Sequence, residues 1–416
     1  MADGDALRAA VNGQVWSMPL DQLNPAQPAL FEADAMWPVF ERLRKEDPVH
    51  HTAESEFGPY WSITRYADVM AVDIDHEAFS SADGVALPDG TAGGELLPSF
   101  IAMDPPTHDQ QRKAVSPAVS PMSLQRLEPL IRERAGQILD DLPIGEEFDW
   151  VDRVSRELTA MTLATLFDVP QADRRKLTYW SDVVFATPGH GLVDSIEHKW
   201  QILREFEAYF VDLWNQRVNA PPGGDLISML AHNLATRDMT PAQYFGNVIL
   251  LTTGGNDTTR NTITGSLLAF NQYPDELRKL REDPDLLPGA MSEAIRWQTP
   301  VSLMRRRATR DVEVGGKAIR KGDKVAMWYI SANRDEEMFE DPHRLIIDRP
   351  RPRSHISFGY GIHRCVGNRL AELQLSIVWQ EILKRFPEII VTGEPKRTHS
   401  IQIRGYEQLM AVIPRR

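Results

Sequence analysis

The sequence contains almost no cysteine: there is one Cys in 416 residues, at position 365. One thiol cannot form a disulfide within the chain, and cysteine-rich zinc sites and iron–sulfur clusters need several thiolates. Covalent attachment of c-type haem through C-x-x-C-H is excluded as well. The roles left for Cys365 are a buried apolar side chain, a nucleophile or a metal ligand.

Long apolar runs and an excess of positive charge are also lacking. No window approaches the roughly 20 consecutive apolar residues of a membrane span. The N-terminus has no basic stretch followed by an apolar one, so we expect no signal peptide and a cytoplasmic location. With 46 Lys and Arg against 59 Asp and Glu, the net charge of −13 argues against nucleic acid as a partner.

The pattern predicts a mainly α fold with a smaller β portion. Helical periodicity dominates from about residue 105 to residue 300, and its longest helix begins at Thr240-Pro241 and continues to Tyr273, before Pro274. Such a helix is roughly 50 Å long. Residues 60–69 read as a strand followed by a helix, and residues 83–98 as an irregular loop that could act as a lid. Further strands are expected at 312–314, 324–329, 389–391 and 399–403.

Cys365 lies in the segment Phe-Gly-Tyr-Gly-Ile-His-Arg-Cys-Val-Gly, residues 358–367, directly before a helical pattern. A helix N-terminus stabilises a thiolate through free N–H groups and the macrodipole, and Gly367 leaves those groups open to the sulfur. Gly359 and Gly361 allow a tight turn and a close approach to a flat ligand. This surrounding favours a thiolate ligand over a buried apolar cysteine.

The long helix carries unusual residues near its middle. Gly254 and Gly255 each lower helix stability by about 1 kcal/mol relative to alanine. Small residues there either pack closely against a neighbouring helix or make room for a small ligand. Asp257 and Thr258 place an acid and a hydroxyl at one point, which is suited to relaying protons.

These two segments resemble the cytochrome P-450 superfamily of haem-thiolate monooxygenases, in the motifs F-x-x-G-x-x-x-C-x-G and Gly-x-Asp/Glu-Thr-Thr. The resemblance implies that Cys365 is the axial ligand of haem b iron, with Phe358 packed beside the sulfur. It implies proton delivery by Asp257 and Thr258. It also implies one domain over residues 30–416, with haem between the long helix and the cysteine loop, and an N-terminal extension over residues 1–29.

A third motif, Glu293-Ala-Ile-Arg296, resembles the E-x-x-R of this family, where it forms a buried structural network. By itself such a pair is usually a solvated salt bridge. Arg344 resembles the third partner of that network. Where the family often has F-D-x-x-R next, this chain has Leu-Ile-Ile-Asp-Arg, which ends at Arg349.

Haem carries two propionates, so an enclosed site should supply cations and hydrogen-bond donors. His108 and Arg112 are spaced to share one helix face, His363 lies two residues before the cysteine, and Arg306 stands at the family's spacing. We expect these four residues to bind the propionates. For His108 and Arg112, the alternative is an exposed basic face.

The segments 103–121 and 254–261 are similar to a bacterial branch that hydroxylates terminal methyl groups of n-alkanes and fatty acids. Steroid-oxidising branches share parts of both segments, so a steroid or terpenoid hydroxylase is the alternative. An apolar pocket is expected from the long helix and the lid loop. Its candidate residues are Leu97, Leu250, Leu251 and Thr253, with Val85, Leu87 and Leu96 from the lid.

The sequence contains no flavin or nicotinamide motif. Electrons should therefore come from a ferredoxin and its NAD(P)H-dependent reductase, with docking near Arg364, Arg369 and Lys113. Two other classes are considered. A haem-based sensor or carrier needs the cysteine loop but not the Asp257–Thr258 pair, and a cysteine hydrolase needs a histidine near Cys365.

Overall fold

The computed structural model describes residues 2–89 and 97–415. Helices dominate the middle of the chain, from α5 (Thr107–Val115) to α13 (Leu287–Gln298), as the sequence predicts. Among the described residues, none of the helices combines the length and the apolar character that a membrane span requires. The other α-helices are α1 (Ala2–Gln14), α2 (Pro28–Glu32), α3 (Trp37–Glu46), α4 (Tyr66–Ile74), α6 (Pro121–Asp140), α7 (Glu157–Phe167), α8 (Arg174–Phe185), α9 (Ile196–Val218), α10 (Leu226–His232), α11 (Pro241–Gln272), α12 (Pro274–Glu282), α14 (Tyr329–Ala332) and α15 (Asn368–Arg385).

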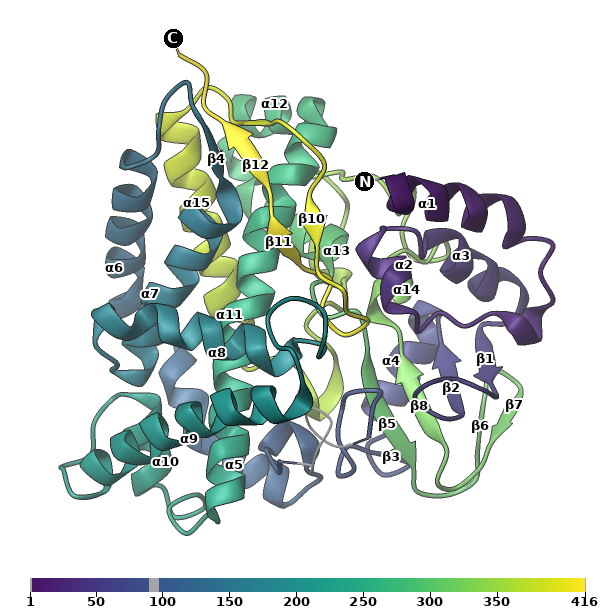
Figure 1. Ribbon diagram of the computed structural model, residues 1–416, viewed down its shortest axis with the longest axis horizontal. Coiled ribbons are helices and arrows are strands. Elements are labelled where there is room, and N and C mark those ends of the chain that lie inside the picture. Colours follow the sequence, from purple (N-terminus) through teal and green to yellow (C-terminus); the bar gives the residue numbers. More distant parts are fainter. Residues whose placement is uncertain (1, 90–96, 416) are drawn as a thin grey trace.

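Helix α11 forms the axis of the helical body (Figure 1). It begins at a capping box, in which the Thr240 side chain accepts the N–H of Gln243 and the Gln243 side chain accepts the N–H of Thr240. It ends at Gln272, because Pro274 cannot continue the hydrogen-bond ladder. The predicted helix is confirmed at both ends. Helices α7, α8, α13 and α15 pack around it.

The strands gather mainly on the other side of the molecule, next to α1–α4 (Figure 1). The largest sheet has the order β1-β2-β8-β5-β3, in which only β2 and β8 are parallel. The strands are β1 (Val49–Thr52), β2 (Tyr60–Ile63), β3 (Phe79–Ser80), β4 (Glu147–Asp149), β5 (Met304–Ala308), β6 (Val312–Val314), β7 (Lys317–Ile319), β8 (Lys324–Met327), β9 (Ile390–Val391), β10 (Lys396–Arg397), β11 (Tyr406–Gln408) and β12 (Met410–Val412).

Three of the four predicted late strands are present as β6, β8 and β9, although β8 ends at Met327, two residues early. The strand expected at 399–403 is wrong. There the Ser400 hydroxyl accepts the backbone N–H groups of Gln402 and Ile403, so this segment is a loop that keeps only one isolated antiparallel bridge, between Ile403 and Val301. The chain pairs just before it instead, where β10 meets β11. The strand and helix expected over residues 60–69 are confirmed as β2 and the start of α4.

The predicted irregular loop contains no helix or strand over residues 83–89 and 97–98, and residues 90–96, including Leu96, lie outside the described residues. Leu87 is fully buried in the cluster around Phe40 and Trp328, so it contributes to the core. The N-terminal segment joins the same cluster through Val15 and Leu23. Residues that precede position 30 therefore pack against the body of the protein.

Candidate active site

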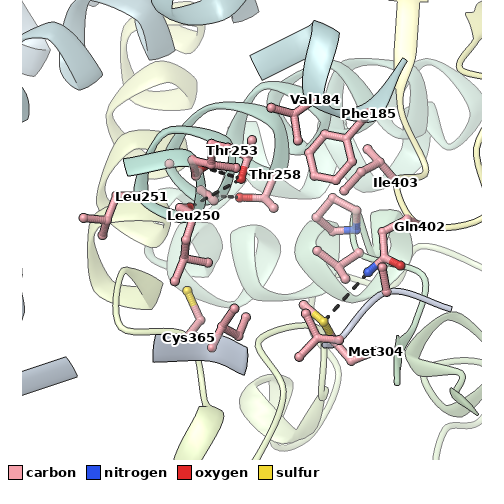
Figure 2. A pocket seen from close by; sticks show the side chains of 18 of the residues that line it. Val184, Phe185, Leu250, Leu251, Thr253, Thr258, Met304, Cys365, Gln402 and Ile403 are labelled. Atoms are coloured by element: carbon pink, nitrogen blue, oxygen red, sulfur yellow. Dashed lines mark hydrogen bonds between the residues drawn. The ribbon is translucent and has the colours of Figure 1, made fainter. Parts of the chain in front are cut away.

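A cavity of about 1020 Å³ lies beside the middle of α11 and extends to the loop that precedes α15. Its wall is mainly apolar. Figure 2 shows Cys365 on one side of this space, beneath Leu250, and Val184 and Phe185 on the opposite side. The cavity thus has one end with a thiol and a far end between α8 and the segment that follows it.

The Cys365 loop is held by its backbone. The N–H of Cys365 donates to the carbonyl oxygen of Phe358 at 2.8 Å, and α15 begins three residues after the cysteine. The thiol is open to the cavity, and burial raises its pKa despite a hydrogen bond from the Gly367 N–H and the charge of Arg112. A metal ion bound at the sulfur would hold Cys365 as the thiolate, and the open position of the sulfur on the cavity leaves room for an iron ion.

The three glycines of this loop have different tasks. Gly361 has φ +63°, and a Cβ there would lie 2.5 Å from the carbonyl oxygen of Asp73, so only glycine fits. Gly359 also has positive φ, at +67°, and it lines the cavity. At Gly367 a Cβ would stand 3.9 Å from the Cys365 sulfur. Phe358 lines the cavity beside them.

The two glycines of α11 face different neighbours. A Cβ at Gly254 would meet no atom within 4 Å, because this position faces the cavity. A Cβ at Gly255 would lie 3.2 Å from the Leu163 side chain, so this glycine also permits close packing against α7. Thr258 lines the cavity and donates its hydroxyl to the Gly254 carbonyl oxygen at 2.8 Å. Gly254 and Thr258 together leave open space on the cavity side of the helix.

Asp257 lies on another face of α11 and does not line the cavity. Its Oδ1 accepts a hydrogen bond from Arg260 Nη2 at 2.6 Å, and its Oδ2 accepts one from Ser181 at 2.5 Å. Burial raises the pKa of Asp257 despite the opposing charge of Arg260. The pair expected at one point is therefore divided between the cavity and a buried polar network.

This network continues toward the surface. Arg260 Nη1 donates to Asp182 Oδ1 at 2.7 Å, and Asp182 Oδ2 lies 3.4 Å from Arg156 Nη2. The side chains of Asp182 and Arg156 are about one quarter exposed. Arg260 was recognisable in the sequence, since it stands three residues after Asp257 on one helix. Asp182 and Arg156 belong to other helices and have no local signal.

Basic side chains gather at the Cys365 end of the cavity. Arg112, Arg306 and His363 line it, and the His108 ring packs edge-on against His363 with 4.3 Å between ring centres. His108 Nε2 and His363 Nδ1 are both buried without a hydrogen-bond partner. Burial and the nearby charges of Arg306 and His108 lower the pKa of His363 to about 2.

Two orphaned ring nitrogens and two guanidinium groups fit the carboxylates of a planar dianion. Arg306 also pairs with Asp73 at 2.9 Å, and Arg112 donates to the carbonyl oxygen of Arg364. His363 Nε2 lies 3.0 Å from the Ser81 hydroxyl. The thiol, the open face of α11 and this basic end together accommodate a haem group.

The four expected pocket residues, Leu97, Leu250, Leu251 and Thr253, all lie on the cavity wall. Thr253 donates its hydroxyl to the carbonyl oxygen of Ile249, so it offers the cavity mainly its methyl group. Sequence reasoning missed other lining residues because they come from distant segments. Among them are Val184, Phe185, Lys199, Met304, Gln402 and Ile403.

The E-x-x-R network is formed as expected, except for its third member. Arg296 donates to both oxygens of Glu293 at 2.7 Å, and both side chains are fully buried. The third side chain is Arg349, whose Nε lies 2.9 Å from Glu293 Oε1. The prediction of Arg344 is wrong, because its side chain is exposed and only its carbonyl oxygen accepts from Arg296.

Comparison with known proteins agrees with this geometry. Residues 36–402 match the family model described as Cytochrome P450. Linalool 8-monooxygenase of Pseudomonas putida is 35% identical over 398 residues, which cover 93% of this chain and 97% of that protein. A methyl-branched lipid omega-hydroxylase of Mycobacterium tuberculosis is 32% identical, with 89% of each chain covered. The structure of CYP153D17 from Sphingomonas sp. PAMC 26605 superposes with a TM-score of 0.90 at 43% identity, covering 95% of this chain and 100% of that one.

Proposed function

This chain belongs to the cytochrome P450 family and is a haem-thiolate monooxygenase, and from this premise we propose that it hydroxylates the terminal methyl group of medium-chain n-alkanes or fatty acids. The observation that carries the proposal is the apolar wall between the Cys365 end and the Phe185 end of the cavity. Such a wall suits an extended aliphatic chain. The relative named methyl-branched lipid omega-hydroxylase supports the same position of attack.

Haem b, held at its iron by Cys365 Sγ, supplies O₂ activation and oxygen insertion when bound. We assign its propionates to Arg112, Arg306, His363 and His108. The charges of the two arginines and the orphaned ring nitrogens of the two histidines support this role. The haem and O₂ have to approach the backbone closely, and space for them is left at Gly254, Gly359 and Gly367. Gly361 acts indirectly, by letting the loop turn against Asp73.

Asp257 and Thr258 have separate tasks in proton delivery. Thr258 faces the cavity with oxygen lone pairs free to accept a hydrogen bond from water, since its own proton goes to Gly254. Asp257 holds a proton more readily than an exposed carboxylate, because burial raises its pKa. Its ion pair with Arg260, and that of Arg260 with Asp182, connect it to partly exposed side chains. We therefore propose that protons reach the cavity from this side of α11.

We propose a ferredoxin and its NAD(P)H-dependent reductase as the source of electrons, in the cytoplasm. Lys113, Arg364 and Arg369 are exposed near the Cys365 loop. Arg364 directly precedes Cys365, so a partner bound there approaches the thiolate side of the site. An acidic ferredoxin surface would complement these three charges.

Product analysis tests the proposed position of attack. The holoenzyme is incubated with ferredoxin, reductase and NADH, and with either octane or dodecanoic acid, and the products are identified by mass spectrometry. Terminal alcohols are the expected products. Subterminal alcohols alone, or no product from either compound, would reject the proposal.

A terpenoid or steroid is the second candidate substrate class. The relative named for linalool favours it, and the mainly apolar wall would also suit a branched hydrocarbon skeleton. Linalool and a steroid belong in the same assay. Faster oxidation of either one than of octane and dodecanoic acid would favour this alternative.

A further inference from the structure

A lysine is buried in the mainly apolar wall of the cavity, beside the segment that follows α8. Lys199 lies in the first turn of α9 and is only 4% exposed. Ile196 and Lys199, three residues apart on one helix face, both line the cavity. A cation at such a position is unusual, because burying an unpaired charge is strongly unfavourable.

The ammonium group of Lys199 is only partly satisfied. Its Nζ donates to the carbonyl oxygen of Ala186 at 2.8 Å. Within residues 2–89 and 97–415, no carboxylate pairs with it, and burial alone lowers its pKa to about 8. An ammonium has three donors, so two remain for another acceptor.

The hydrogen-bond partner of Lys199 places it on the side of the cavity opposite the thiol. Ala186, its hydrogen-bond partner, directly follows Val184 and Phe185, which Figure 2 shows across the cavity from Cys365. A molecule bound to Lys199 at one end would therefore extend along the apolar wall toward Cys365.

We propose that Lys199 binds the carboxylate of a medium-chain fatty acid and so directs the methyl end of the chain toward the haem. This inference rests on the function proposed above, and it selects fatty acids over n-alkanes as the preferred substrates. The carboxylate would accept the two free ammonium protons and supply the missing counter-charge. The apolar wall would contact the rest of the chain.

Equilibrium binding to the holoenzyme tests the inference, with the shift of the haem Soret band as the signal. The probes are dodecanoate and dodecan-1-ol, which have equal length and differ in charge. We expect wild type to bind dodecanoate more tightly. Lys199→Met should lower the affinity for dodecanoate by about tenfold or more, the effect expected for loss of a hydrogen bond to a charged group. The affinity for dodecan-1-ol should stay unchanged. Lys199→Arg should retain most of the preference.

Lys176→Met is the matched control, since Lys176 is half exposed on the neighbouring helix α8 and pairs with Asp173. Equal affinity of wild type for the two probes would overturn the inference, and this measurement needs no variant. Equal weakening of both probes by Lys199→Met would also overturn it. If dodecanoate binds through Lys199 but yields only subterminal alcohols, the proposed terminal attack fails while the carboxylate site stands.

Discussion

Asp257 and Thr258 are adjacent in sequence, yet only Thr258 lines the cavity, while Asp257 accepts a 2.6 Å hydrogen bond from Arg260. Successive residues of an α-helix point about 100° apart, which turns the Asp257 side chain away from the cavity that Thr258 lines. The acid therefore sits among Ser181, Asp182 and Arg260, behind the hydroxyl. Each residue can be tested separately.

Replacing Asp257 by Asn should slow product formation by about 100-fold or more, because a positioned acid contributes at least that much to proton transfer. The side chain keeps its size, so the reduced CO complex should keep its red-shifted Soret band. Turnover of the terminal-hydroxylation reaction under saturating ferredoxin is the measurement. Asp275→Asn, at an exposed position of α12, is the control. Unchanged turnover in Asp257→Asn would remove this residue from proton delivery.

Replacing Thr258 by Ala should uncouple the reaction. The hydroxyl that faces the cavity is lost, so NADH oxidation continues while hydrogen peroxide is released in place of alcohol. The ratio of alcohol to NADH consumed measures the effect. Thr258→Ser keeps the hydroxyl and should restore most of the ratio. Full coupling in Thr258→Ala would show that the hydroxyl is dispensable.

Features that depend on neighbouring residues could be predicted from the sequence. The limits of α11 follow from the Thr240 cap and from Pro274, and the setting of Cys365 follows from its glycines and the helix after it. The sequence motif also located Glu293 and Arg296, because an i, i+3 pair is a local feature.

Features that depend on the packing of distant segments could not be predicted from the sequence. Lys199 reaches the cavity only because α9 packs beside the end of α8. The hydrophobic periodicity of the sequence does not indicate that contact. The choice between Arg344 and Arg349 depends on how an irregular segment folds back onto α13. The segment 399–403 alternates like a strand, but the Ser400 hydroxyl accepts the N–H groups of Gln402 and Ile403, and only one isolated bridge to Val301 forms.

Arg349 and Arg344 provide a matched pair for the corrected network. Arg349→Ala should lower the free energy of unfolding by about 3–5 kcal/mol, because it leaves the buried Glu293 carboxylate short of a partner. Arg344→Ala removes an exposed side chain and should change the free energy of unfolding by less than about 0.5 kcal/mol. Guanidinium denaturation followed by circular dichroism measures both. Equal destabilisation by the two variants would contradict the assignment.

Arg112 and Arg306 can be tested through haem retention. Replacing both by Ala should speed the transfer of haem to apomyoglobin, since the propionates lose two cationic donors. Arg307→Ala is the control, because Arg307 is adjacent on β5 but pairs with Asp83 outside the cavity. Haem transfer from the double variant as slow as from wild type would exclude a propionate role for both residues.

The charge of Lys199 should make fatty-acid binding depend on pH. Burial lowers the pKa of Lys199 to about 8, so the ammonium is present below that pH and lost above it. Dodecanoate stays ionised throughout the range from about pH 7 to about pH 9.5. Its affinity should therefore fall above pH 8, approaching about tenfold per pH unit, whereas dodecan-1-ol affinity should stay constant.

Two variants separate this titration from other effects of pH on the protein. In Lys199→Arg the guanidinium stays charged across the whole range, so the decline in dodecanoate affinity should disappear. In Lys199→Met dodecanoate should bind weakly at every pH. Titrations of the holoenzyme by the Soret shift at each pH give both curves. A decline that persists in Lys199→Arg would assign the titration to a different group and separate Lys199 from carboxylate binding.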